Sequence, residues 1–502
     1  MSAPILGAFI THESKPSLPV SGLAPVLHRD QVSTGQPTEY ELNELRWGER
    51  LNGPKTTPET PTTITQSFSQ SQEELESNFG TSQNPDQAID AFIPSASNPP
   101  RNRWRLAAAG VMFLLMGIND AATGALIPYL EKEYDISYGV VSLIFITNAI
   151  GFISIVPVCQ MIEGKIGRAL SCVVAACLMS IGYIALVCAP PFPVVVLSFF
   201  FLGSGMGFFL AMTNAFMVNL MRGTVILGSM HGLYGVGGTV SPLMATAIVT
   251  RGIRWSYFYF VPLSLALASI IFMGWSYKGF ESDAAFPLLT ELEQTASRQA
   301  ASPGEPTKSQ LLRRALGQRT TLLGAAFIFF YQGAEVAISG WVISYLITYR
   351  NGDPSQAGHI GSGFWLGITV GRFVLTHFAH KLGEKRAVVG LTIGAAGFQL
   401  LVWLVPNIIG NAVAESLVGL FLGPVYPCAT AVFSKLLPRN IQVTALSVVG
   451  GMGSSGGALV PFITGMLAQR LGTVVLHPIV LISLASMLVT WFLLPRIGKR
   501  SE

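Results

Sequence analysis

The sequence contains few charged residues for its length. Of its 502 residues, 12% are Asp, Glu, Lys or Arg, whereas 50% are hydrophobic. A soluble domain carries about 25% charged residues, so this scarcity argues against a soluble protein. The net charge of +4 is small and scattered along the chain, which argues against binding to nucleic acid. The composition predicts a protein that lies in a membrane.

Sequence patterns for catalysis and for cofactor binding are also missing. The chain has no Walker lysine, no His/Glu spacing typical of a metal site and no nucleophile elbow. All five cysteines lie in apolar segments and lack the spacing of metal ligands or of structural disulfides. We therefore predict neither an enzyme nor a protein with a cofactor or a metal ion.

The first hundred residues differ from the rest of the chain. They are rich in Ser, Thr, Gln, Pro and Glu, as in residues 62–71. Such a segment buries too little apolar surface to offset the entropy of ordering it. We predict that residues 1–100 form a disordered cytoplasmic tail, which is either inert or modified by phosphorylation or ubiquitination.

From Trp104 onward, apolar stretches long enough to cross a bilayer alternate with short polar breaks. A polar gap at 278–319 separates six such stretches from six more. The predicted spans are 105–130, 139–162, 170–189, 194–219, 228–250, 255–277, 320–348, 358–380, 387–405, 411–435, 442–468 and 475–495. The sequence predicts an all-α membrane protein with twelve transmembrane helices. They form two six-helix bundles, residues 101–277 and 320–496, joined by a cytoplasmic linker at 278–319.

Basic residues are unevenly distributed between the two sides of the predicted bundles. One side has many, including Arg101, Lys165 and Lys381. The other side has only Lys132, Arg251, Arg254, Arg350 and Arg470. Because Lys and Arg concentrate in cytoplasmic loops, we predict that both termini are cytoplasmic. We expect the plasma membrane by default, and vacuolar or endosomal membranes stay open as alternatives.

Two segments of the chain repeat one another. Residues 117–124 read GINDAATG and residues 333–340 read GAEVAISG, an offset of 216 that also relates Tyr129-Leu130 to Tyr345-Leu346. A second match has an offset of 219, which a short slip in a loop explains: Gly232, Gly237, Gly238 and Pro242 correspond to Gly451, Gly456, Gly457 and Pro461. Two six-helix halves around a midplane site are a known transporter architecture, in which one half rocks against the other.

Each repeat carries an acid deep in an apolar helix. Asp120 lies within the first span, and Glu335 aligns with Asn119 rather than with Asp120. A carboxylate at the centre of a bilayer costs about 2.5–3.5 kcal/mol, so such an acid needs compensation or a function. We predict that both acids bind substrate or protons. The alternative for each is a structural acid that is hydrogen-bonded to a neighbouring helix.

Further candidates lie in the same helices. Amide and aromatic side chains suit an organic substrate with hydroxyl groups, although they equally serve as packing. The predicted substrate- and proton-binding residues are Asp120, Glu335, Asn119, Asn214, Gln332, Tyr331, Trp341 and Tyr345. Glycine allows close helix contact and proline bends a helix. The predicted conformational hinges are Gly237, Pro242, Gly456 and Pro461.

Two further charged residues lie inside predicted spans. Arg372 is about two turns from the cytoplasmic end of the eighth span, where it either reaches the membrane surface or pairs with an acid. Glu415 is close to the outer end of the tenth span, so we expect its side chain to be exposed.

Together these features resemble the Major Facilitator Superfamily over residues 104–495. The loops at 163–168 and 381–386 are similar to the loop signature of that family. Residues 117–120, 205–207 and 423–427, with Asn214, resemble its fucose–proton symporter branch, and the long polar tail resembles fungal members. The resemblance implies that Asp120 takes part in substrate binding and proton coupling. The glutamate of that branch four residues before Asn214 is Leu210 here, so Glu335 is the candidate for the missing acid.

The leading prediction is a secondary active transporter of a small organic solute, coupled to protons and working by alternating access. We favour efflux of a secondary metabolite, because of Leu210 and because Gly237 with Ser241-Pro242 weakly resembles an antiporter signature. The alternatives are a proton-coupled sugar importer and a transporter-like sensor that signals through the tail. We expect a monomer whose partners are the solute, protons and the lipid bilayer.

Overall fold

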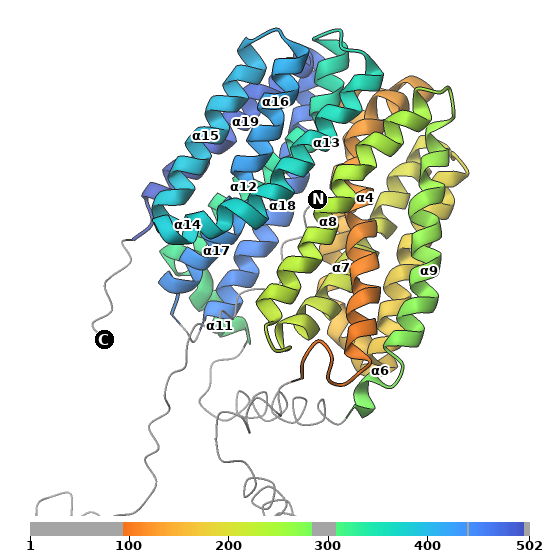
Figure 1. Ribbon diagram of the computed structural model, residues 1–502, viewed down its shortest axis with the longest axis vertical. Coiled ribbons are helices and arrows are strands. Elements are labelled where there is room, and N and C mark those ends of the chain that lie inside the picture. The colour runs from red at the N-terminus through yellow and green to blue at the C-terminus, as the bar shows by residue number, and fades with distance from the viewer. Residues whose placement is uncertain (1–93, 284–307, 439–440, 496–502) are drawn as a thin grey trace, which may run out of the picture. The chain divides into compact units, whose positions relative to one another are not determined.

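The chain is helical throughout the part that the structure describes. In the computed structural model this part comprises residues 94–283, 308–438 and 441–495 (Figure 1). The N-terminal bundle contains α4 (Asn102–Tyr134), α5 (Tyr138–Val141), α6 (Leu143–Val187), α7 (Phe192–Val218), α8 (Gly223–Val249), η1 (Trp255–Tyr259) and α9 (Phe260–Ser276). The C-terminal bundle contains α12 (Arg319–Thr348), α13 (Pro354–Val370), η3 (Gly371–Leu375), α14 (Thr376–Leu382), α15 (Glu384–Leu404), α16 (Ile408–Leu422), α17 (Val425–Leu436), α18 (Gln442–Leu471), η4 (Thr473–Val475) and α19 (Leu476–Phe492). Within these ranges no strand occurs, in agreement with the predicted all-α fold.

The predicted tail and linker are described only in part. Residues 1–93 and 284–307 lie outside the described ranges. The last residues before α4 lie against the N-terminal bundle, because Asn102 donates a hydrogen bond to the Ser95 carbonyl and Met221 donates its N–H to the Pro94 carbonyl, both at 2.8 Å. The linker region begins with η2 (Phe280–Ser282) and ends with α11 (Lys308–Leu316), a helix that the sequence reading did not predict.

Among the described residues, eleven helical segments are long and apolar enough to cross a membrane. They overlap eleven of the predicted spans. The second and third spans both belong to α6, whose course turns at Gly167 with a φ of +77°. Glycine suits this backbone conformation because it has no Cβ.

The eighth predicted span is interrupted. It consists of α13, the π-helical turn η3 and α14, and α13 has only 17 residues, so no single helix here is long enough to be counted as a span. π-Helical turns are rare in proteins, and those that occur are often found at functional sites.

At the start of α13, the Ser355 hydroxyl (2.6 Å) and backbone N–H (2.9 Å) donate to the Asp353 carboxylate. These bonds hold the pKa of Asp353 below its ordinary value.

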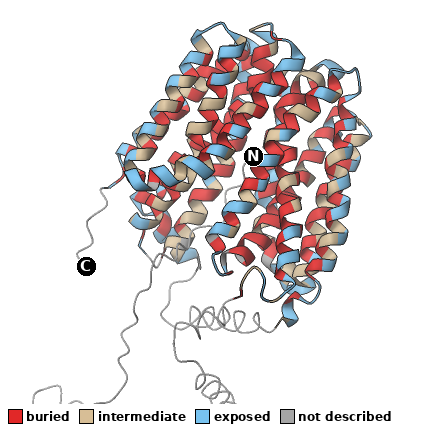
Figure 2. Ribbon diagram, viewed as in Figure 1, coloured by how far each residue is buried: buried red, intermediate tan, exposed pale blue. Residues whose placement is uncertain are grey.

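The two bundles contact one another through several pairs of helices. Inside the N-terminal bundle α4 packs on α8, and inside the C-terminal bundle α12 packs on α18. Between the bundles, α8 contacts α13, α18 contacts α5 and α6, and α4 contacts α12. Buried residues follow the inner faces of the helices (Figure 2). Large apolar side chains on the outer faces are exposed, such as Ile271 and Ile409 at 76% and 77%, as expected for surfaces that face lipid.

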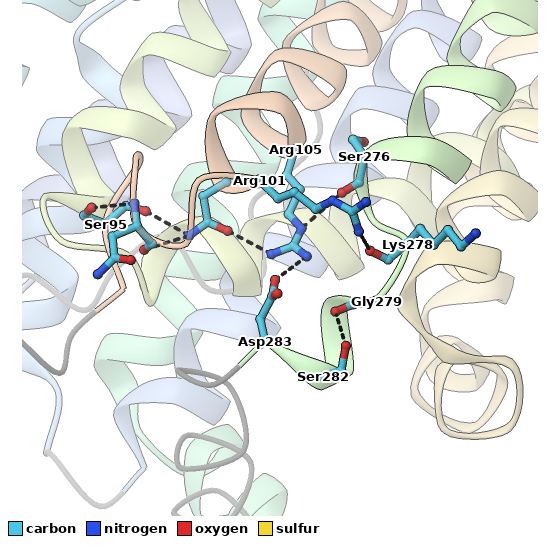
Figure 3. A network of polar contacts seen from close by, with 10 residues as sticks. Ser95, Arg101, Arg105, Ser276, Lys278, Gly279, Ser282 and Asp283 are labelled. Carbon is cyan, nitrogen blue, oxygen red and sulfur yellow. Dashed lines mark hydrogen bonds and ion pairs between the residues drawn. The ribbon is translucent and has the colours of Figure 1, made fainter.

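One end of the bundles, where α4 and α12 begin, is rich in basic side chains and is called here the basic end. There the buried Arg105 forms an ion pair with Asp283 (2.5 Å) and donates hydrogen bonds to Asn102 (3.0 Å) and the Ser276 carbonyl (3.3 Å) (Figure 3). Arg101 donates to the Lys278 carbonyl beside it. These contacts attach the segment that follows α9 to the first turn of α4.

Candidate functional site

Asp120 lies at the centre of a chain of hydrogen bonds inside the N-terminal bundle. Its carboxylate is buried, with 6% of the residue exposed. Tyr234 of α8 donates its hydroxyl to one oxygen (2.6 Å), and the Asn119 amide donates to the other (3.2 Å). Tyr183 of α6 donates in turn to the side-chain oxygen Oδ1 of Asn119 (3.2 Å). Three helices therefore hold one buried carboxylate with neutral hydrogen-bond donors.

Asp120 also lines a small cavity between the two bundles. The N-terminal bundle contributes Asp120, Thr123, Ile144, Phe145, Asn148 and Phe199, and α12 contributes Val336, Ser339 and Gly340. The volume in which the centre of a water molecule can lie is about 10 Å³. A volume of this size holds about one water molecule. A solute of sugar size therefore does not fit in this cavity in the present conformation.

Glu335 is fully buried, within electrostatic range of Tyr234 of the N-terminal bundle. Its carboxylate forms an ion pair with Arg372 of η3, with 3.5 Å between Oε2 and Nη2. Tyr331, one turn earlier on α12, lies beside both groups and donates its hydroxyl to the Leu422 carbonyl (3.3 Å). Arg372 thus pairs with an acid, one of its two expected roles, and it does so from the π-helical turn.

The two acids differ because they are one residue out of step in the repeat. Asp120 and Val336 are 216 residues apart and both line the cavity, as do the equivalent Thr123 and Ser339. Glu335 is instead equivalent to Asn119, whose side chain bonds inside its own bundle. Successive residues on a helix point about 100° apart, since one turn takes 3.6 residues. The structure therefore places Asp120 in the cavity lining and Glu335 outside it.

The other predicted site residues are dispersed. Trp341 lies near the cavity, donating its indole N–H to the Pro461 carbonyl (2.9 Å) and packing on Tyr138 of the other bundle. Gln332 is buried beside Gly457 of α18. Tyr345 accepts a hydrogen bond from Arg350 (2.8 Å), about 15 Å along α12 from Glu335.

Asn214 is buried on α7, and no described group bonds to its amide oxygen. The Asn119 amide reaches α7 at Met206, with 3.7 Å between nitrogen and sulfur. Asn214 is eight residues further on, about 12 Å towards the basic end. The structure therefore does not bring Asn214 to the Asp120 cavity.

The predicted hinge residues lie in closely packed helices. Gly237 faces the Leu114 carbonyl of α4, and Gly456 faces the Phe329 carbonyl of α12, so that a Cβ at either position would meet backbone. Pro242 and Pro461 lie inside the continuous helices α8 and α18. These contacts explain why glycine is needed here; bending at these residues stays a prediction.

Several residues of the site were not predicted from the sequence. Tyr183 and Tyr234 bond to the Asn119–Asp120 pair, and Asn148 and Ser339 line the cavity. A signal existed for Ser339, which lies in the same repeat as Glu335. The expected exposure of Glu415 is wrong: this residue is fully buried between helices of the C-terminal bundle.

Known proteins share this sequence pattern and fold. The Major Facilitator Superfamily profile matches residues 109–350 and 325–502. Bypass of stop codon protein 6 of Saccharomyces cerevisiae is 28% identical over 426 residues, which cover 80% of this chain and 84% of that protein. A D-xylose–proton symporter matches with a TM-score of 0.64 and 13% identity, over 79% of this chain and 99% of its own.

The E. coli fucose–proton symporter matches with a TM-score of 0.53 and 16% identity, over 77% of this chain and 97% of its own. At such low identities the two symporters share the fold with this chain. The family profile extends over most of the sequence, and the two helical bundles agree with it. The chain belongs to the Major Facilitator Superfamily and is a membrane transporter.

Proposed function

We propose that the protein couples the movement of a small hydroxylated solute to that of protons, and that Asp120 carries the proton. The observation that supports this most is the position of Asp120, buried between neutral donors and lining the cavity between the bundles. A phenol or an amide can bond to a carboxylate and to a carboxylic acid alike. Asp120 can therefore gain or lose a proton while its neighbours stay hydrogen-bonded.

The cavity lining favours a sugar or a polyol as the solute. Thr123, Asn148 and Ser339 offer hydroxyl and amide groups, and Phe145 and Phe199 offer aromatic surface. A mainly apolar lining with a few well-placed polar groups is typical of small-molecule sites. The matched structures are described as symporters of xylose and fucose, which supports the same class here.

Glu335 has a different proposed role. Its charge is balanced by Arg372, and a buried ion pair is costly to break because one charge is then left alone. We assign Glu335 to holding α12 against η3, and the proton to Asp120. This division replaces the prediction that both acids carry protons.

A binding screen followed by transport assays tests the proposal. A ligand that binds the folded protein raises its melting temperature. D-xylose, L-fucose, D-glucose and mannitol would be compared with amphipathic aromatic compounds at acidic and neutral pH. With a stabilising sugar, Asp120→Asn is expected to abolish accumulation driven by a pH gradient in vesicles. It should retain solute counterflow, which needs no net proton movement.

Glu133→Gln is the matched control, because Glu133 is an acid in an exposed ion pair with Arg254. It should leave both assays unchanged. Normal accumulation by Asp120→Asn would contradict the proposal.

Export of an amphipathic metabolite is the second candidate function, favoured by the buried apolar Leu210 on α7. Stabilisation only by amphipathic compounds, with efflux into an acidic compartment, would replace sugar symport by this function.

The proposed orientation places the basic end in the cytoplasm of a plasma-membrane protein. Arg101, Arg168 and Lys385 lie at that end, as expected for cytoplasmic loops. Cys188 lies at the opposite end and is the exposed cysteine among the five. A membrane-impermeant maleimide should therefore label intact cells, and Cys188→Ser should remove the label. Labelling only after permeabilisation would reverse the orientation or move the protein to an internal membrane.

A further inference from the structure

A second polar cluster lies in the C-terminal bundle, away from the Asp120 cavity. Its acid is Glu415, on α16 within the candidate span Ile408–Leu436. The residue is fully buried, and no group in the described part of the chain forms a hydrogen bond with either carboxylate oxygen. Asp120 accepts hydrogen bonds and Glu335 forms an ion pair, so Glu415 differs from both acids.

The polar groups near Glu415 bond mainly to one another, although Gln399 Oε1 and His477 Nε2 have no hydrogen-bond partner among the described residues. Gln399 of α15 lies 2.7 Å from Nδ1 of His477, and the His477 ring packs edge-on against Tyr345 at 4.2 Å. Tyr345 lies within electrostatic range of Glu415. The nearby cation, Arg350, donates to the Tyr345 hydroxyl (2.8 Å) and to the carbonyls of Val402 (3.2 Å) and Trp403 (2.5 Å).

The remaining ionisable groups on the helices packed against α16 lie further away along the bundle. Gly363 of α13 faces Ser416, so Arg372 is about 13 Å further towards the basic end. Gly394 of α15 faces Phe421, which puts Gln399 near the level of Glu415 and the charged start of α15 about 20 Å away. His359, one turn nearer the opposite end on α13, is exposed.

An isolated carboxylate is strongly disfavoured at such a place. Transfer of a charge from water into an apolar interior carries a large free-energy penalty, and an unpaired group avoids it by taking up a proton. In a membrane protein, ionisable residues inside spans commonly mark proton pathways. Burial and the lack of a partner therefore both indicate that Glu415 is a neutral carboxylic acid in this conformation.

We propose that Glu415 is a second proton-binding site, separate from Asp120 and reached from the opposite end of the C-terminal bundle. Near that end, Tyr345 and Arg350 offer a hydroxyl and a guanidinium to the carboxylate once it loses the proton. The use of this proton in transport rests on the proposed function. The presence of a proton on Glu415 does not depend on the proposed function. The bound proton and its use in transport can therefore be tested by separate experiments.

Infrared spectroscopy of the full-length protein in lipid vesicles tests the bound proton directly. A protonated carboxyl group has a C=O stretching band well separated from that of a carboxylate, and the band shifts in deuterium oxide. We expect such a band at neutral pH in the parent protein and its loss in Glu415→Gln. Glu415→Asp should retain a band at a changed frequency, which also covers the case in which the amide variant does not fold.

Two control variants show whether the infrared band belongs to Glu415, whatever the transport assays show for Asp120. Glu133→Gln removes an exposed, ion-paired acid and should leave the band intact. Asp120→Asn should also retain the band of Glu415, whether or not it loses accumulation. A neutral-pH spectrum of Glu415→Gln that equals the parent spectrum would overturn the inference. A band lost in Asp120→Asn and kept in Glu415→Gln would assign the proton to Asp120 and overturn it as well.

Discussion

Asp120 and Glu335 occupy neighbouring positions of a repeated segment, yet their surroundings differ. Asp120 accepts hydrogen bonds from neutral groups and lines the cavity, whereas Glu335 forms an ion pair with Arg372 inside its own bundle. At the position equivalent to Asp120, the C-terminal bundle has Val336. The repeat has thus kept its helix packing while the chemistry of the two halves has diverged. In the proposed function, the acid of one half carries the proton and the ion pair of the other half holds two helical elements together.

The largest expected effect comes from breaking the fixed pair. Arg372→Met leaves the buried Glu335 carboxylate without its cation, and removal of one partner of a buried ion pair costs about 3–5 kcal/mol. We expect a clear fall in the melting temperature of the purified protein. The double variant Arg372→Met/Glu335→Gln should recover most of this loss, because it no longer buries a charge.

An exposed ion pair supplies the control for this comparison. Arg254 and Glu133 are 2.7 Å apart, but their side chains are 50% and 38% exposed. Such pairs contribute about 0–1 kcal/mol, so Arg254→Gln should hardly change the melting temperature. If Arg372→Met unfolds at the same temperature as Arg254→Gln, the ion pair does not hold α12 against η3.

Much of this fold could be predicted from the sequence. Apolar stretches and the offset of 216 residues indicate the spans and the two bundles, because both depend on composition along the chain. The interruption at Gly371–Leu375 could not be predicted, since a π-helical turn leaves no pattern in an apolar segment. The depth of Asp120 and Glu335 was predicted for the same reason as the spans.

The direction of side chains could not be predicted. In a helix that is apolar on all sides, position along the chain gives depth but not the neighbour that a side chain meets. Glu415 was expected to be exposed because it is close to the outer end of its span, but its side chain meets neighbouring helices and is buried. The hydrogen bond between Tyr234 and Asp120 depends on how α8 packs against α4. The two helices are in close contact at Gly117, where a larger residue would bring a Cβ against the Tyr234 carbonyl. Such contacts join residues that are far apart in sequence.

The second prediction changes the neutral partners of Asp120. Tyr234→Phe removes a hydroxyl that bonds to the carboxylate at 2.6 Å. A hydrogen bond contributes about 0.5–1.5 kcal/mol, and more when one partner is charged. The variant takes this donor away from the buried carboxylate. We therefore expect accumulation driven by a pH gradient in vesicles to fall several-fold.

Tyr183→Phe is the matched control for that variant. Tyr183 donates to Asn119 and reaches Asp120 only through that amide, so its loss should lower accumulation less. Both variants keep the aromatic ring and therefore the packing. Equal losses of accumulation in the two variants would mean that the chain of hydrogen bonds acts as one unit rather than through Tyr234.

The smallest expected effect compares equivalent glycines on the two helices that meet at the cavity. A Cβ at Gly124 would meet the backbone carbonyl of Ser339, whereas one at the equivalent Gly340 would meet the far edge of the Phe145 ring. Overpacking costs about 1–3 kcal/mol where the neighbour cannot move, and a ring can turn aside more easily than a helix backbone. Gly124→Ala should therefore lower the melting temperature more than Gly340→Ala. Gly340→Ala should instead weaken solute binding, because Phe145 also lines the cavity. The opposite order of melting temperatures would show that the backbones of α4 and α12 are free to separate at this crossing.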